Sequence, residues 1–286
     1  MNFLTSILDK IEGVKRKDLD VIDVYMELWQ HTFDISPEQY DDLVSKIKEI
    51  SPDTVQTKAR LSFTDTIKFI FYPNLGDSNK SAWESYHLFE QCGDRCGMGI
   101  ALGPIALNYK NVGLFEQALE TIQLAVNYLG NNSYYNYFIG VSYYQEGDIH
   151  LALKDFPAAI QVFNKGMEVV GDTQKPIAAR LMSSMALVHI ETNQFDLAEE
   201  LFIKALNYID SRSGQLEESK IYTDLGKLYL KKQDFDKAIY YHGKSIEIRS
   251  KLNHRHSLIT NYIELSKVYI LKNNIHEALE IGRAHV

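Results

Sequence analysis

A repeat with a period near 40 residues constrains this chain more than any other feature of its sequence. An alanine recurs at intervals of 41, 39, 40 and 40 residues, at Ala118, Ala159, Ala198, Ala238 and Ala278. A large apolar residue lies three positions before each alanine, at Phe115, Phe156, Phe195, Phe235 and Ile275. Self-similarity at a fixed period is typical of arrays in which each structural unit packs on its neighbours.

The same interval indicates a second helix before each alanine. Counting back twelve and nine positions gives a small residue and then a ring, at Ala106 and Tyr109, Ala186 and His189, Gly226 and Tyr229, and Ser266 and Tyr269. Residues three apart share a helical face, so the small one lets two helices approach and the ring packs beside it. The second unit departs from the pattern with Gly147 and His150. Short polar connections, one with Gly113 available for a positive φ, predict antiparallel helix hairpins.

These paired patterns resemble the tetratricopeptide repeat (TPR) family. The resemblance is carried by the small–x2–Tyr pair of the first helix and by an Ala–x3–aromatic pair in the second, as in Ala159–Phe163 and Ala198–Phe202. It covers residues 96–282 and implies an all-α, right-handed TPR-like superhelical solenoid of antiparallel helix hairpins. The period exceeds the usual length of about 34, and the family's first-helix Trp and repeat-ending Pro are missing. The longer period is similar to that of bacterial regulatory TPR proteins.

We therefore predict three segments. Residues 1–95 form an N-terminal helical region, either a cap of possibly degenerate repeats or a small bundle, and residues 96–280 form an array of about five hairpins. In the first segment, Ser36-Pro37-Glu38 and Ser51-Pro52-Asp53 each predict a helix start. Residues 80–94 resemble the second helix of a degenerate hairpin that ends at Gly93.

The third segment is the C-terminal string "IGRAHV", residues 281–286. The fifth hairpin follows the repeat as far as Leu279 and then loses the pattern. The string is also the translation of a widely used sequencing adapter. We therefore expect a non-native tail on a C-terminally truncated gene product, which a clean genomic read across the locus would test.

Composition narrows the function classes. The net charge of -8 argues against a general nucleic-acid surface, which requires a basic patch. No apolar run approaches the roughly 20 residues that span a bilayer, and no secretion signal begins the chain. Two cysteines indicate reducing conditions rather than a disulfide framework. We expect a cytoplasmic protein without membrane or nucleic-acid contacts in this segment.

Few side chains suggest chemistry. Cys92 and Cys96 form either half of a metal site or a redox pair, or they are two thiols at a bend; a zinc site needs about four ligands. "GMGIALG" (97–103) lacks the strand and the Lys-Ser/Thr of a phosphate-binding loop. His254 and His256 flank an arginine in a predicted turn, and His242 takes a packing position. We predict no catalytic residue, cofactor or metal in this segment, and the full-length gene product stays open.

The resemblance implies that the first helices line a concave groove that binds a protein or peptide. In the first, third, fourth and fifth hairpins the groove positions are Lys110 and Asn111; Arg180 and Ser183; Lys220, Thr223, Lys227, Leu230 and Lys231; and Thr260, Ile263 and Lys267. Several cations on one wall favour an acidic peptide or carboxylate terminus, while the alternative is an ordinary solvated face. Tyr134, Tyr137 and Tyr144 form a stripe that either enters the core or lines the groove.

Three functional hypotheses follow. The first is a TPR protein- or peptide-binding module that is the sensory or scaffolding part of a cytoplasmic bacterial signalling regulator. The second is the regulatory region of an enzyme (a histidine kinase, a nucleotide or diguanylate cyclase, or a phosphatase) or of a transcriptional regulator whose output domain is missing. The third is a peptide-pheromone receptor whose N-terminal bundle acts on a response regulator. The sequence does not identify the ligand, pathway or oligomeric state.

Overall fold

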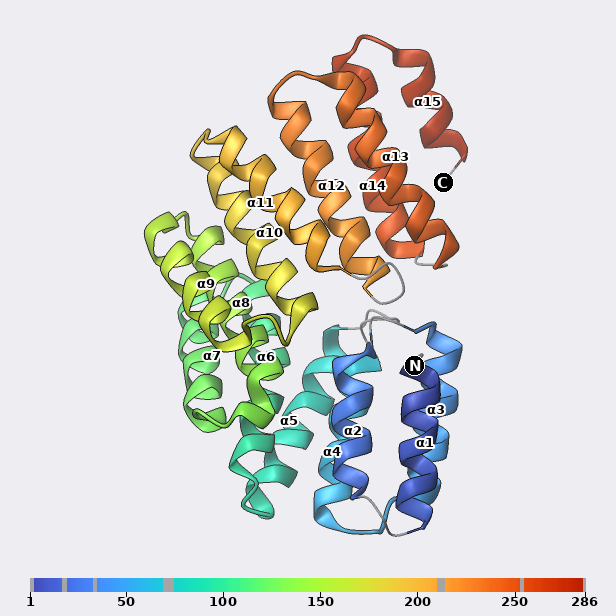
Figure 1. Cartoon of the computed structure of the whole chain (residues 1–286), viewed down its shortest axis with the longest axis vertical. Helices are drawn as coiled ribbons and strands as arrows, with labels where there is room; N and C mark the ends of the chain where they lie inside the picture. The colour runs from blue at the N-terminus through green and yellow to red at the C-terminus, as the bar shows by residue number, and fades with distance from the viewer. Residues whose placement is uncertain are drawn as a thin grey trace. The chain divides into compact units, whose positions relative to one another are not determined.

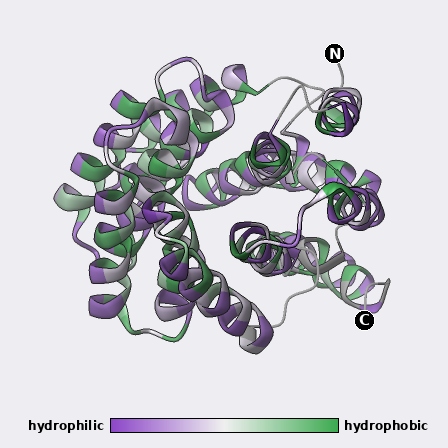
Figure 2. Ribbon diagram, turned by 90° about the horizontal axis from the view of Figure 1, so that it is seen from below, coloured by the Kyte–Doolittle hydropathy of each residue, from purple (hydrophilic) through white to green (hydrophobic). Residues whose placement is uncertain are grey.

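The computed structural model describes residues 3–16, 20–32, 35–68, 75–209, 214–252 and 255–284. Within these ranges the chain forms fifteen α-helices and no β-strand (Figure 1). The all-α class predicted from the repeat is therefore confirmed. Hydrophilic and hydrophobic residues alternate along the helices, as expected for helices that each bury one stripe (Figure 2).

The N-terminal helices are α1 (Phe3–Lys15), α2 (Val21–Gln30), α3 (Pro37–Ile50), α4 (Val55–Lys68) and α5 (Leu75–Gln91). Helix α3 begins as predicted, because Ser36 and Gln39 exchange side-chain hydrogen bonds in a capping box. The second predicted start is wrong. Ser51 ends α3, and α4 begins after Thr54, whose hydroxyl accepts the Thr57 N–H.

The remaining helices match the predicted pairs. They are α6 (Arg95–Asn111), α7 (Phe115–Leu129), α8 (Asn136–Ala152), α9 (Phe156–Val170), α10 (Lys175–Glu191), α11 (Phe195–Tyr208), α12 (Gln215–Lys231), α13 (Phe235–Lys251), α14 (Arg255–Leu271) and α15 (Ile275–Ala284). Each second helix begins at the large apolar residue of the repeat. Helix α15 continues to Ala284, so part of the predicted tail is helical, and residues 285–286 lie outside the described ranges.

The turns inside the pairs share one geometry. The middle residue of each three-residue turn has a left-handed backbone, with φ of 82° at Gly113, 60° at Lys154, 59° at Asn193, 61° at Gln233 and 63° at Asn273. The next residue's N–H then donates to the carbonyl five positions earlier, a helix-ending motif that satisfies free carbonyls. The prediction for Gly113 is confirmed, but its repetition with larger residues was not anticipated.

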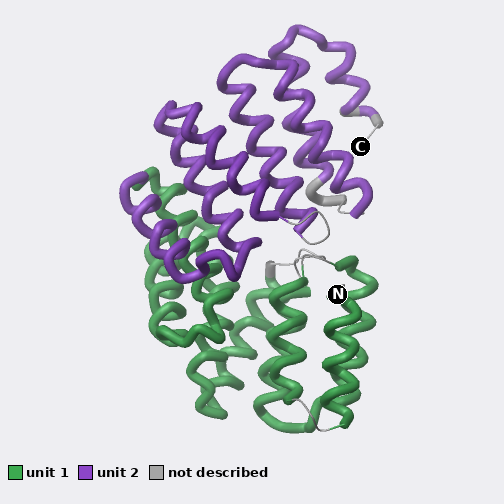
Figure 3. The backbone as a smooth tube through the Cα atoms, viewed as in Figure 1, with its two compact units in different colours: residues 1–155 green, residues 156–286 purple. Residues whose placement is uncertain are grey.

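The chain divides into two compact units, residues 1–155 and residues 156–286 (Figure 3). The division falls at the turn between α8 and α9, and each unit is described by itself. The boundary at residue 95 that the sequence suggests lies inside the first unit and stays a prediction.

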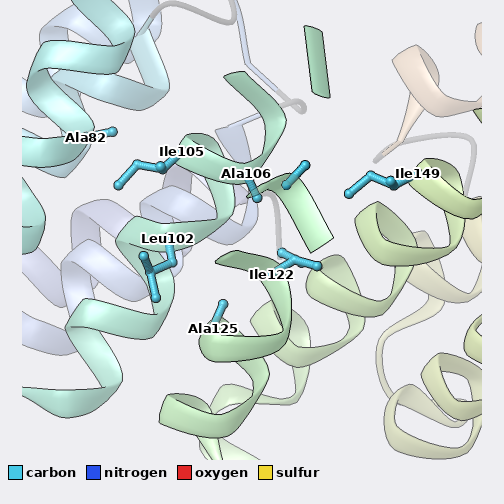
Figure 4. Close-up of a cluster of buried hydrophobic side chains, with 8 residues drawn as sticks. Ala82, Leu102, Ile105, Ala106, Ile122, Ala125 and Ile149 are labelled. Carbon is cyan, nitrogen blue, oxygen red and sulfur yellow. The ribbon is translucent and has the colours of Figure 1, made fainter. Parts of the chain in front are cut away.

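The alanines of the repeat form the core. Ala118, Ala159, Ala198 and Ala238 have no exposed surface, and Ala278 is also buried, as the repeat predicts. In the first unit the alanine positions join a cluster from α5 to α8 that contains Ala82, Leu102, Ile105, Ala106, Ala118, Ile122, Ala125 and Ile149 (Figure 4). Phe195 and Phe235 are only partly buried. Their truncation should therefore cost less than the roughly 3–5 kcal/mol expected of a fully buried ring.

Candidate functional site

Most of the predicted site residues lie on three first helices of the second unit. Helix α12 packs against α10, and α14 packs against α12 (Figure 1). These three helices carry ten of the twelve predicted groove positions: Arg180, Ser183, Lys220, Thr223, Lys227, Leu230, Lys231, Thr260, Ile263 and Lys267. We call this set the first-helix surface. The other two, Lys110 and Asn111, belong to the end of α6 in the first unit, where Asn111 is exposed.

Two of the predicted cations converge on one carboxylate. The Arg180 guanidinium of α10 lies 2.8 Å from Glu217 Oε2 of α12, and both side chains are largely buried. Lys220 Nζ lies 4.0 Å from the other oxygen of Glu217. Burial alone would raise the pKa of the Glu217 carboxyl, but the charges of Arg180 and Lys220 outweigh it and lower that pKa. This carboxylate therefore stays ionised between the two helices.

The other predicted cations also face carboxylates. Lys227 Nζ lies 2.9 Å from Asp224, and Lys267 Nζ lies 2.8 Å from Glu264, each one helical turn away. Lys231 of α12 lies 2.8 Å from Glu191 of α10, and Lys110 pairs with Asp148 in the first unit. The surface thus presents pairs of opposite charge. It lacks the one-sided positive charge that the lysines alone suggested, because their acidic partners lie one turn or one helix away.

A buried polar network supports the first-helix surface. The Thr223 hydroxyl lies 2.9 Å from Ser245 Oγ and 3.0 Å from Asn261 Oδ1. The Arg249 guanidinium donates to Ser219 Oγ at 3.0 Å and to Asn261 Oδ1 at 2.5 Å. All five side chains are buried, and they come from α12, α13 and α14. We call Ser219, Thr223, Ser245, Arg249 and Asn261 the polar junction.

Asn261 and Arg249 of the polar junction occupy positions that are apolar in other helices of the array. Asn261 lies five residues before the small residue of its helix, where α12 has Ile221 and α10 has Leu181. Arg249 corresponds to Val170 of α9, and all these residues are buried. The sequence reasoning missed this network. The available signal was an arginine at a register position that otherwise holds Val, Ile or Leu, and an asparagine where α10 and α12 hold Leu and Ile.

His242 packs into the core beside the polar junction. It has no exposed surface, and neither ring nitrogen has a hydrogen-bond partner among the described residues. Burial lowers the pKa of its imidazole from 6.5 to about 4, so the ring is neutral at neutral pH. A Cβ added at Gly226 would lie 2.6 Å from this ring, which explains a glycine at the small position of α12. The predicted packing role of His242 is therefore confirmed.

Ser183 and Thr223 are both buried, although the sequence placed them on the groove wall. Thr223 belongs to the polar junction, and the Ser183 hydroxyl has no hydrogen-bond partner among the described residues. A ligand on the first-helix surface would first meet the exposed lysines, so these two hydroxyls as direct contacts stay a prediction. Of the tyrosine stripe, Tyr137 is buried, while Tyr134 is exposed and donates its hydroxyl to Asp23 at 2.7 Å.

The remaining motifs of the sequence are the two cysteines, the glycines and the histidine pair. Cys92 and Cys96 flank the turn between α5 and α6 as free thiols, and burial raises the pKa of Cys96. The glycines of residues 97–103 lie inside α6, where a Cβ on Gly97 would be 2.3 Å from the Phe89 ring. His254 lies outside the described residues, as does the side chain of His256. The described side chains contain no group of three or more His, Cys, Asp or Glu arranged to hold a metal.

A comparison with protein families now bears on this geometry. A family model described as Tetratricopeptide repeat matches residues 141–169 and 219–252. The second match covers most of α12 and α13, and the helices, turns and buried alanines repeat on both sides of it. The two matched segments are tetratricopeptide repeats. No curated protein matches its sequence.

Solved structures share this TPR fold at low sequence identity. The apo form of RapI has a TM-score of 0.61 and 14% identity, covering 99% of this chain and 96% of that chain. A Rap protein complexed with Competence and Sporulation Factor has a TM-score of 0.66 and 15% identity, covering 87% of this chain and 68% of that chain. The APC/C hetero-tetramer Cut9-Hcn1 has a TM-score of 0.69 and 15% identity, covering 98% of this chain and 50% of that chain.

The TPR match supports a protein-interaction module, and the solved structures show that the chain has the TPR fold. Its described helices include none with the length and apolar character needed to cross a membrane. Most of the predicted site residues lie on the first-helix surface, which shares Thr223 with the polar junction. We therefore take that surface as the candidate functional site.

Proposed function

We propose that this TPR protein binds a peptide segment through its first-helix surface, as the sensory or scaffolding part of a cytoplasmic bacterial signalling regulator. The observation that carries the proposal is that ten predicted groove positions lie on three first helices that pack in sequence. Their lysine side chains are exposed, whereas Glu217 and Asp224 beneath them are buried. Buried partners fix the positions of exposed donors, which lowers the entropy cost of binding.

The arrangement of charge favours a peptide with both donors and acceptors. Each cation of the surface already has a carboxylate within 4.0 Å, so a run of acidic side chains would meet like charge as often as opposite charge. A peptide backbone carries one donor and one acceptor at each residue and matches such paired groups. We therefore replace the acidic ligand expected from the sequence with a polar peptide of mixed character.

The likeness to Rap proteins supports a peptide-receptor role over an enzyme-regulatory one. It extends over nearly all of RapI, so the N-terminal helices α1–α5 belong to the shared fold. A second Rap structure holds Competence and Sporulation Factor. At 14–15% identity this likeness shows the fold, and the ligand of this chain needs a direct test.

The test begins with selection of random peptides displayed on phage against the 286-residue chain. Fluorescence anisotropy then measures how a selected peptide binds to wild type and to the Lys227→Glu, Lys231→Glu double variant. We expect at least about a tenfold loss of affinity, near 1.4 kcal/mol, because both reversals leave a carboxylate facing Asp224 or Glu191.

The control is Lys204→Glu, Lys251→Glu. These lysines pair with Glu200 and Glu247 on second helices, so the control changes the net charge equally but lies away from the first-helix surface. Affinity should stay within about twofold of wild type in this control. Equal binding by wild type and both double variants would contradict the proposed site.

A further inference from the structure

Two buried oxygen atoms at the first-helix surface lack hydrogen-bond partners. They are Ser183 Oγ, in a side chain that is 3% exposed, and Glu217 Oε1, in one that is 7% exposed. Neither atom has a hydrogen-bond partner among the described residues. Because buried polar atoms are normally hydrogen-bonded, these two mark a place where a ligand can supply the missing bonds.

The two oxygens belong to neighbouring helices that contact each other. Ser183 follows Arg180 by three residues on α10, so both side chains lie on one face of that helix. The Arg180 guanidinium lies 2.8 Å from Glu217 Oε2 of α12. The contact between α10 and α12 therefore includes the turns that carry both oxygens.

The register of the repeat also directs Ser183 toward the turn that begins at Glu217. The counterpart of Ser183 on α12 is Thr223, whose hydroxyl lies 3.0 Å from Asn261 of α14. Asn261 corresponds to Ile221 of α12, which lies one helical turn after Glu217. By the same register, Ser183 faces the turn of α12 between Glu217 and Ile221.

Lys220 lies beside the unpaired oxygen of Glu217. Its ammonium is 4.0 Å from Oε1, which is longer than a hydrogen bond. The Lys220 side chain is 41% exposed, and its flexible stem can turn aside. A ligand can therefore reach a carboxylate oxygen that is buried in the free protein.

The charge around Glu217 selects a neutral ligand group. Arg180 and Lys220 lie within 4.0 Å of this one carboxylate, and the charge of Arg249 also lowers its pKa. A ligand ammonium would add another positive charge to this set and would be repelled. A ligand carboxylate has only acceptor oxygens, whereas Glu217 Oε1 needs a donor. A neutral group with both a donor and an acceptor meets these requirements.

A side-chain carboxamide meets them better than a backbone amide does. In a trans peptide unit the N–H and the C=O point in opposite directions, so one unit cannot turn both toward the same surface. The carboxamide of Asn or Gln carries two donor hydrogens and a carbonyl oxygen at one end of the side chain.

We propose that the first-helix surface selects an asparagine or glutamine side chain of its peptide, whose N–H donates to Glu217 Oε1 and whose carbonyl accepts from the Ser183 hydroxyl. The inference rests on the proposed peptide binding and names the residue type that this surface recognises. A site with buried hydrogen-bonding groups discriminates strongly against analogues that leave those groups unpaired.

The probe is the peptide most enriched from the random phage library, synthesised with fluorescein at its N-terminus and a free C-terminus. It should contain Asn or Gln. Replacing that residue with Asp or Glu of the same shape should lower its affinity for wild type at least about tenfold in fluorescence anisotropy, because the donor to Glu217 is lost.

Ser183→Ala tests the protein side without a risk to folding, because this hydroxyl has no hydrogen bond to lose in the free protein. Its thermal unfolding midpoint should equal or exceed that of wild type. Its affinity for the carboxamide peptide should fall at least about fivefold, while its affinity for the acidic analogue should not change.

The matched control is Ser142→Ala on α8. Ser142 is also 3% exposed, but its hydroxyl donates to the Phe138 carbonyl of the same helix. The affinity of this control for the carboxamide peptide should stay within about twofold of wild type, because Ser142 lies outside the first-helix surface.

The outcomes separate this inference from the proposed peptide site. If Lys227→Glu, Lys231→Glu weakens binding but Ser183→Ala binds as tightly as wild type, the carboxamide site is overturned and the peptide site stands. Enriched peptides without Asn or Gln would have the same meaning. If no peptide is enriched, or if wild type and both lysine double variants bind equally, both proposals fail.

Discussion

Where α6, α7 and α8 meet, the repeat buries apolar side chains such as Ile105, Ile122 and Ile149 (Figure 4). Where α12, α13 and α14 meet, it buries Arg249 and Asn261 among hydroxyl groups. The period sets which positions are buried in both places, yet the chemistry at those positions differs. Burial in a repeat is therefore a property of register, while the kind of interaction is free to vary from one hairpin to the next.

The two junctions should respond differently to substitution. Apolar burial is non-directional, so the loss of one methyl group costs about the transfer energy of that group plus a small cavity. A buried hydrogen-bond network is directional, and removal of one member leaves its partners without hydrogen bonds in a low dielectric. The polar junction also lies beneath the candidate binding surface, through Thr223 of α12. Its rigidity would hold that surface in place for a ligand.

The largest effect should come from Asn261→Leu. The new side chain matches Leu181 in the α10 register but removes the acceptor of Arg249 and the donor to Ser245 Oγ. We expect a loss of about 2–3 kcal/mol in the free energy of unfolding, measured by urea denaturation, because the buried guanidinium then loses one of its hydrogen-bond acceptors.

The double variant Arg249→Leu, Asn261→Leu sharpens this prediction. It removes both members and restores the apolar pattern of the other hairpins, so it should be more stable than Asn261→Leu alone. Replacing a buried polar pair with apolar groups is often neutral or stabilising. The single variant Arg249→Leu completes the comparison. If the stability losses of Arg249→Leu and Asn261→Leu add up to the loss of the double variant, the network does not couple these residues, and the contrast between the apolar and polar junctions fails.

An intermediate effect is expected at His242, which takes the register position of Phe163 and Phe202. The pKa of the buried imidazole is lowered from 6.5 to about 4, so the unfolded chain takes up the proton first as the pH falls. This contribution to stability is complete above about pH 6.5 and is lost as the pH falls toward 4. At pH 5 the loss reaches about 2 kcal/mol.

His242→Phe should remove that loss. Lys227, Asp224, Glu264 and Arg249 are the charged groups whose fields act on the ring, and their signs balance in number. Urea denaturation at pH 7.5 and pH 5 should show wild type losing about 2 kcal/mol more than the variant. If wild type and His242→Phe lost the same free energy of unfolding between pH 7.5 and pH 5, the acid sensitivity would belong to other groups.

The repeat in the sequence was sufficient to predict the helices, their pairing and the buried alanines, because size alternation at a fixed interval leaves few ways to pack. It failed where partners come from elsewhere in the chain. The lysines of α12 looked like a one-sided cationic wall, but Lys231 pairs with Glu191, 40 residues away. Likewise, only the contacts of Arg249 with Asn261 and Ser219 show why this arginine is buried.

The smallest effect concerns the turns, which differ between the α6–α7 and α12–α13 hairpins. The left-handed position is Gly113 between α6 and α7 and Gln233 between α12 and α13, with φ of 82° and 61°. A side chain in this conformation costs roughly 1–2 kcal/mol, whereas glycine adopts it freely but gains entropy in the unfolded chain. Gln233→Gly should therefore stabilise the protein by about 0.5 kcal/mol.

The reverse change, Gly113→Ala, should destabilise by about 1 kcal/mol, although a Cβ there would meet no atom within 4 Å. Thermal unfolding of both variants measures the pair. Since neither turn residue touches the core, opposite signs would show that backbone conformation alone separates them. Stability changes of the same sign in both variants would mean that the entropy of the unfolded chain decides both effects. The turns would then contribute nothing to the difference between the apolar α6–α8 junction and the polar α12–α14 junction.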